Sequence, residues 1–186
     1  MVLGLGLWLV IGAAVVLVIM FISYFNRFAV LGNRIDSSLS QIDVQLKRRA
    51  DLIPNLIESV KGYVKHEKSI IKDVTDARKE LVGAKGIVDR VNANRKLQSA
   101  LGSLFAIAEN YPNLKANENF LELQRELTTT EDKISYARQF YNDSILAYNT
   151  LCTTFPGTFF AGIYGKKSRE YLQIAEAERK NVKVQF

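Results

Sequence analysis

The stretch LGLGLWLVIGAAVVLVIMFISYF, residues 3–25, contains no charged side chain and is almost wholly apolar. As a helix it would reach about 34 Å, enough to cross the ~30 Å hydrocarbon core of a bilayer. Trp8 and Tyr24 lie near its two ends, where amphipathic rings prefer the membrane interface, and Arg27 follows directly. A cleaved signal peptide needs a basic N-terminal region, a shorter apolar core and a small-residue cleavage site, and this stretch has none of the three. We therefore predict a transmembrane anchor over residues 1–26, with a buried core helix as the alternative.

The flanking charges predict an orientation. No Lys or Arg precedes the apolar stretch, whereas Arg27, Arg34 and the run at 47–49 follow it. Because basic loops stay inside, we expect a single-pass protein of the cell (inner or plasma) membrane, with its N-terminus outside and residues 27–186 in the cytoplasm.

The net charge of +6 is unevenly placed along the chain. Residues 1–100 contain 15 Lys and Arg and 9 Asp and Glu, and residues 101–186 contain 10 of each. Such a basic half either contacts anionic headgroups or coats solvated helix faces. The basic residues alternate with acids and lack an aromatic stacking pattern, so we expect no nucleic-acid partner.

Beyond the anchor, apolar residues recur at three- and four-residue steps, which predicts a long helix with one buried seam. The seam consists of Ile35, Leu39, Ile42, Leu46, Ile53, Leu56, Val60 and Val64. Gly32 and Asn33 are expected to loosen the joint with the anchor. Pro54 is expected to kink or break the helix, because it removes the hydrogen bond to the carbonyl of Ala50.

Similar patterns predict further helices over residues 67–81, 88–108 and 117–150, and a short C-terminal helix over 169–180. Only three prolines occur, and no long stretch alternates between apolar and polar residues. Long seams joined by short turns favour an all-α fold, with an N-terminal transmembrane helix followed by an antiparallel bundle of about four long helices.

Several motifs resemble those of the LemA family of bacterial membrane proteins. They are RRADLIPNL at 48–56, VKGY at 60–63, AENYPNLKANENF at 108–120, LTTTEDKI at 127–134, RQFYN at 138–142, and FPG at 155–157. The resemblance implies one span and a bundle of long helices. It implies no reaction, since the family's biochemical role is poorly defined. Links of relatives to internal-membrane shaping and to membrane proteases hint at scaffolding. Within these motifs we expect structural roles for Arg49, Asp51, Pro54, Asn55, Glu109, Tyr111, Pro112, Glu131, Asn142 and Asn149.

Arg49 takes a seam position that calls for an apolar residue. We expect it to pair with a carboxylate such as Glu109 or Glu131 and to set the register of the helices. Asn142 and Asn149 are expected to tie helices together by hydrogen bonds.

The residues capable of chemistry form no catalytic or metal-binding set. Di-iron bundles use Glu-x-x-His pairs, but His66 is the single histidine, and Tyr63 stands where the glutamate would be. A zinc-protease motif would need a second histidine at Ile70. Cys152 has no partner thiol and reads as a core residue. We therefore expect no enzyme activity, no cofactor and no metal.

The segment 155–165 is expected to be an apolar loop with five large side chains. Exposed, it would be a membrane-dipping or partner-binding patch; packed on the bundle end, it would be a core cap. These residues are Phe155, Phe159, Phe160, Ile163 and Tyr164.

Three functions are weighed on this basis. The first is a membrane-anchored, non-enzymatic scaffold, whose partners are the lipid bilayer, further copies of the chain as a homo-oligomer, or another membrane protein. The second is a membrane-tethered sensing or signalling module that binds a ligand between helices. A hydrolase or metalloenzyme ranks last.

Overall fold

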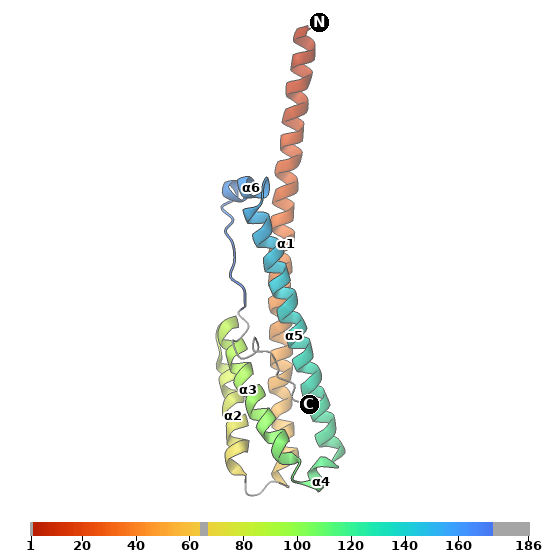
Figure 1. Ribbon diagram of the computed structural model, residues 1–186, viewed down its shortest axis with the longest axis vertical. Helices are drawn as coiled ribbons and strands as arrows, with labels where there is room; N and C mark the ends of the chain where they lie inside the picture. The colour runs from red at the N-terminus through yellow and green to blue at the C-terminus, as the bar shows by residue number, and fades with distance from the viewer. Residues whose placement is uncertain (1, 64–66, 173–186) are drawn as a thin grey trace, which may run out of the picture. The chain divides into compact units, whose positions relative to one another are not determined.

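The computed structural model describes residues 2–63 and 67–172, and the described chain is helical with no strand (Figure 1). The long helices are α1 (Val2–Lys61), α2 (Lys68–Gly83), α3 (Ile87–Ala108) and α5 (Glu118–Thr153). Two short helices, α4 (Pro112–Lys115) and α6 (Gly157–Ile163), stand before and after α5. The prediction of an all-α fold with one long apolar N-terminal helix is confirmed.

The chain forms two compact units. The central unit is Ser38–Gln139 and contains the second half of α1, the helices α2 to α4 and the first part of α5. The terminal unit consists of the described residues up to Ser37 and from Phe140 onward. Each unit is described separately below.

Ion pairs and hydrogen bonds give the helix directions in the central unit. Between α1 and α5, Arg48 meets Glu126 at 2.6 Å, and Tyr63 accepts a hydrogen bond from Asn117, so these two helices are antiparallel. The pairs Asp43–Arg90 and Arg49–Asn94 show in the same way that α3 runs parallel to α1. Residues 84–86 join α2 to α3 in a short turn, and Glu80 meets Lys96 between the two helices, so α2 runs antiparallel to α3. The central unit is therefore an up-down-up-down bundle of four helices.

The predicted apolar seams form the core of the bundle. Each fully buried Leu or Ile contributes roughly 1.5–3 kcal/mol relative to exposure. In the central unit the buried apolar residues include Ile42, Leu46, Ile53, Leu56, Val60, Val74, Leu81, Val91, Leu97, Leu101, Leu104, Phe120, Leu127 and Ile134.

In the terminal unit, the part of α1 that contains Phe28 and Arg34 lies against the last part of α5. The rings of Phe28 and Tyr148 meet edge to face with centroids 5.7 Å apart, and Arg34 lies over the ring of Phe140. The sequence numbers rise on one helix and fall on the other, so the pair is antiparallel. Phe28, Ile35 and Ile145 are buried.

The structure differs from the sequence-based expectations in three places. Gly32 and Asn33 do not loosen α1, which is helical through both residues. The segment 155–165 was predicted as a loop but includes the helix α6. The first residues of the helix predicted over 169–180, Arg169 to Leu172, are not helical, and residues 173–180 lie outside the described residues.

Pro54 lies inside α1 without ending it, because another helix satisfies the carbonyl that the proline leaves open. Position 54 has no N–H to donate to the Ala50 oxygen. Arg78 of α2 supplies the donor instead: its Nε donates to the Ala50 oxygen at 2.8 Å. Ala50 is buried and the bond is part-buried, so Arg78 gives this carbonyl a donor within the protein. Of the two outcomes expected at Pro54, the break is wrong, and the kink stays a prediction.

We expect Arg78→Leu to lower the free energy of unfolding by about 1.5–3 kcal/mol, because a buried carbonyl loses a charged donor. In a Pro54→Ala background the loss should be clearly smaller, since the residue at 54 then has an N–H for Ala50. The coupling between positions 54 and 78 is measured by denaturant unfolding, in one detergent, of the unchanged protein, the two single variants and the double variant. Equal losses in both backgrounds would contradict this role of Arg78.

Candidate functional site

The first part of α1 is long and apolar enough to cross a membrane, by length and composition. No residue of its most apolar window is buried within the protein, in contrast to the core helix considered as the alternative. Trp8 is exposed near the beginning of this stretch and Arg27 at its end. The guanidinium of Arg27 lies 5.9 Å from the ring centre of Tyr24, so these two interface candidates are in contact.

The helix α6 packs against α1 through an aromatic cluster, which we define as Phe21, Tyr24, Phe25, Phe28, Phe160 and Tyr164. The rings of Tyr24 and Phe160 are stacked with centroids 4.6 Å apart. The Tyr164 ring meets the rings of Phe21, Phe25 and Phe28 edge to face at 5.1–6.0 Å. The Tyr164 hydroxyl also donates to the Phe21 oxygen at 2.6 Å. The cluster therefore attaches α6 to the last turns of the apolar stretch.

The segment 155–165 is neither wholly exposed nor wholly packed. Phe160 is buried and Tyr164 is half-buried, so these two residues pack against α1 as core residues do. Phe155, Phe159 and Ile163 are 87%, 63% and 52% exposed.

Gly157 permits the tight connection between α5 and α6. A Cβ at this position would overlap the Leu151 carbonyl, so only glycine fits so close to the end of α5. The FPG motif at 155–157 thus has a steric reason.

Asn142 and Asn149 bind main chain rather than a second helix. The Asn142 side chain accepts from the Leu172 N–H at 3.0 Å and donates to the Leu172 oxygen at 3.1 Å. Asn149 makes the same pair of bonds with Arg169, at 2.8 and 2.9 Å. Seven helical residues advance about 10.5 Å, and three extended residues advance about 10 Å, so the two spacings match. Together the two asparagines form a clamp for the segment 169–172.

Arg49 is buried among α1, α3 and α5 and forms an ion pair with Glu131. Its Nη1 also donates to the Asn94 oxygen at 3.1 Å, and Asn94 donates to Glu131 at 3.3 Å. Burial lowers the pKa of Arg49 to about 10, which keeps the guanidinium charged at neutral pH. Between the two carboxylates expected from the sequence, Glu131 is the partner. Glu109 is exposed at the end of α3. Asn94 was missed by sequence reasoning, since no signal distinguished it from a surface amide.

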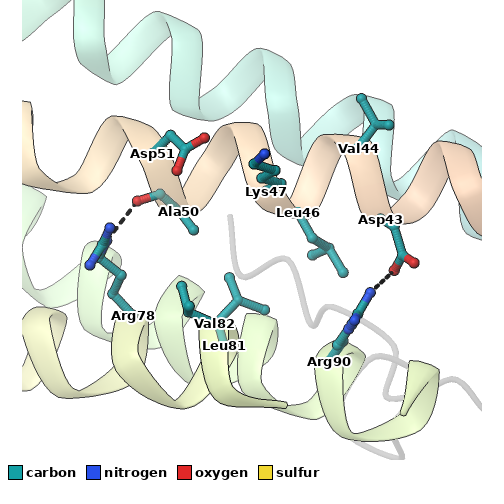
Figure 2. A pocket seen from close by; sticks show the side chains of 10 residues that line it. All are labelled: Asp43, Val44, Leu46, Lys47, Ala50, Asp51, Arg78, Leu81, Val82 and Arg90. Atoms are coloured by element: carbon teal, nitrogen blue, oxygen red, sulfur yellow. Dashed lines mark hydrogen bonds and ion pairs between the residues drawn. The ribbon is translucent and has the colours of Figure 1, made fainter. Parts of the chain in front are cut away.

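A groove of about 450 Å³ lies among α1, α2 and α3 of the central unit (Figure 2). Leu46, Ala50 and Leu81 form its apolar floor. The exposed side chains of Val44 and Val82 adjoin this floor. The rim is charged and of mixed sign: it consists of Asp43, Lys47, Asp51, Arg78 and Arg90. Arg90 is held in place by Asp43 at 2.6 Å and by the Ala84 oxygen. The groove therefore suits an apolar surface with charged edges rather than a small anion.

The remaining motif residues lie at helix ends or on the surface. Asp51 lines the groove, and Asn55 faces a second hollow between α1 and α5. Tyr111 is the residue before α4, and Pro112 is its first residue, where a missing N–H costs nothing. The positions of Tyr111 and Pro112 are consistent with the structural roles expected of them, between the end of α3 and the start of α4.

Within residues 2–63 and 67–172, no group of three or more His, Cys, Asp and Glu side chains is arranged to hold a metal ion. His66 lies outside the described residues. Cys152 is buried, and burial raises the pKa of its thiol, so it is a poor nucleophile in this setting.

The fold and its surfaces define a helical-bundle protein with one helix suited to span a membrane. The chain belongs to the LemA family, whose sequence model matches residues 38–186. It is similar to the magnetosome protein MamQ of Magnetospirillum gryphiswaldense, with 27% identity over 173 residues covering 79% of this chain and 64% of that protein. It is also similar to Protein LemA of Metamycoplasma hominis, with 29% identity over 160 residues covering 81% of this chain and 69% of that protein. The chain therefore spans less than two thirds of the MamQ relative's length.

Removing the partner of Arg49 should destabilise the central unit strongly. We expect Glu131→Ala to cost roughly 3–5 kcal/mol of unfolding free energy, because it leaves a buried charge unpaired. The double variant Arg49→Met with Glu131→Ala should recover much of this loss. Denaturant unfolding measures both, with Glu122→Ala on the exposed face of α5 as the control. A double variant as unstable as the sum of its parts would contradict the pairing.

Each asparagine of the clamp should protect one backbone amide. Asn149→Ala should speed hydrogen exchange at the Arg169 amide, and Asn142→Ala should do so at the Leu172 amide, because each loses its acceptor. Exchange measured by NMR or mass spectrometry tests this, with Asp143→Ala, exposed on the same helix, as the control. Unchanged exchange at both amides would rule out the clamp in solution.

Proposed function

We propose that this chain is a membrane-anchored, non-enzymatic scaffold that assembles with itself or with a membrane protein. The observation that carries the proposal is the exposed apolar surface of α1 between Leu7 and Phe25, followed by a charged helical body in the same unbroken helix. Exposure of such a large apolar surface to water is unfavourable, whereas a bilayer would cover it.

The use of polar side chains in the body supports a structural role. Arg49 faces Glu131 and Asn94, Arg78 caps a carbonyl, and the two asparagines of the clamp hold main chain. Each of these groups has a partner within the protein. An active site would instead bring reactive groups together in a cavity.

The location and orientation follow from the same argument. We propose that residues 1–26 span the cell (inner or plasma) membrane and that the N-terminus lies outside. The body would then lie in the cytoplasm, because the basic residues follow the apolar stretch. The similarity to MamQ, named as a magnetosome protein, supports a role at a membrane.

A second candidate function is sensing, favoured by the groove among α1, α2 and α3. Its apolar floor and charged rim would accept an amphipathic ligand. Such a ligand would raise the melting temperature of the full-length protein in a metabolite panel. A panel without any shift would count against this candidate.

Assembly is tested by the mass of the full-length protein in detergent, beside a version lacking residues 1–26. We expect a defined oligomer, and the shorter version should retain it if the body drives assembly. Exposed valines in the groove give a sharper test. Val44→Lys should reduce the oligomer by placing a charge beside the apolar floor, whereas Val88→Lys, similarly exposed on α3 outside the groove, should not. Monomers in both versions would contradict self-assembly and leave a membrane-protein partner.

A further inference from the structure

The helix α6 is seven residues long, and Thr158 is the one residue in it with a polar side chain. One face, with Gly157, Phe160 and Ala161, is buried against the rest of the terminal unit. On α6, Phe159 and Ile163 are four residues apart and exposed, and Phe155 is exposed in the turn before the helix; we call these three residues the outer stripe. Large apolar side chains exposed near one another indicate contact with a membrane or a partner. An apolar cover for the outer stripe is therefore favoured.

The place of attachment indicates what covers it. The buried face of α6 contacts Phe21, Tyr24 and Phe25 through the aromatic cluster, and these residues end the apolar stretch of α1. On α1 itself, Phe21, Ile22 and Phe25 are exposed. The outer stripe and these α1 side chains thus belong to the same unit, with α6 attached within one helical turn, about 6 Å, of the end of the stretch.

The polar groups around α6 are those of a membrane interface. Both tyrosines of the aromatic cluster, Tyr24 and Tyr164, are of a residue type that favours the headgroup level of a membrane. Lys166 and Lys167 are exposed directly after α6, and residues 154–169 contain no acidic side chain. Such a segment matches anionic headgroups in charge.

We infer that α6 is a second membrane-contacting element, whose outer stripe enters the lipid where α1 leaves the bilayer, with Lys166 and Lys167 at anionic headgroups. The inference rests on the proposed anchor. The chain would thus contact one leaflet through two elements, a spanning helix and a short interfacial helix. Because Phe160 and Tyr164 attach α6 to the end of the apolar stretch of α1, lipid is favoured over a protein partner as the cover of the outer stripe.

Tryptophan fluorescence tests the depth of the outer stripe. The chain contains one tryptophan, Trp8, so a Trp8→Phe background offers a silent full-length protein. In this background we compare Phe159→Trp with Tyr136→Trp, an exposed aromatic position where no lipid contact is proposed. Each protein is reconstituted in vesicles of mixed phosphatidylcholine and phosphatidylglycerol that carry bromines near the top or the middle of the acyl chains. Ile163→Trp repeats the test at a second position of the stripe.

We expect Phe159→Trp to emit at shorter wavelength and to be quenched several-fold more strongly than Tyr136→Trp, with bromines near the headgroups most effective. Equal, weak quenching of both would overturn the inference. Shielded emission without quenching by bromines would also overturn it, because a second copy or a partner protein would then cover the stripe. Trp8 in the natural sequence separates the two proposals: its quenching by bromolipids tests the anchor independently of α6.

A charge variant tests the headgroup contact. Lys166→Gln with Lys167→Gln should weaken the extra quenching that anionic vesicles give over neutral ones at position 159. Glutamine at Lys72 and Lys133 of the central unit, also exposed, is the matched control. An identical response of both double variants would remove the lysines from the inferred contact.

Discussion

The charged side chain of Arg49 is buried between three helices, and the arrangement of the central unit depends on how that charge is compensated. An isolated buried guanidinium would cost several kcal/mol, by order of magnitude. Glu131 of α5 supplies the opposite charge, and Asn94 of α3 bridges the two side chains. A shift of α5 by one residue would turn Glu131 about 100° away from α1. The ion pair therefore permits one register of α1, α3 and α5.

The neighbouring residue, Ala50, connects the fourth helix at the same level. Pro54 opens the Ala50 carbonyl, and Arg78 of α2 closes it. Positions 49 and 50 of α1 thus contact α2, α3 and α5 through three polar groups. The RRADLIPNL motif, which carries Arg49, Ala50 and Pro54, consequently has a structural explanation: it is the point at which the four helices of the bundle are aligned. The groove of Figure 2 lies beside this point, since Ala50 and Arg78 both line it.

The sequence predicted the helices well because apolar periodicity is a local signal, and α2, α3 and α5 begin and end within a few residues of the predicted bounds. It predicted that Arg49 needs a carboxylate, but it left Glu109 and Glu131 as equals, because the choice depends on helix register. For Asn142 and Asn149 it predicted interhelical bonds, whereas their partner is extended main chain, which periodicity does not reveal. Finally, α6 was read as a loop, since seven residues after a Pro-Gly pair give too short a pattern.

The distribution of polar and apolar groups supports the proposed scaffold. In an active site, a shifted pKa marks a group that awaits a substrate. The pKa of Arg49 is lowered by burial, but its charge is retained and faces a carboxylate of the same unit, so this shift has a structural origin. The surfaces that lack cover are apolar: Val44 and Val82 at the groove, and the outer stripe on α6. Binding at such surfaces is driven by removal of apolar area from water, and a membrane, another protein or the amphipathic ligand considered for the groove would provide the cover. The physical chemistry of these surfaces therefore supports the proposed association.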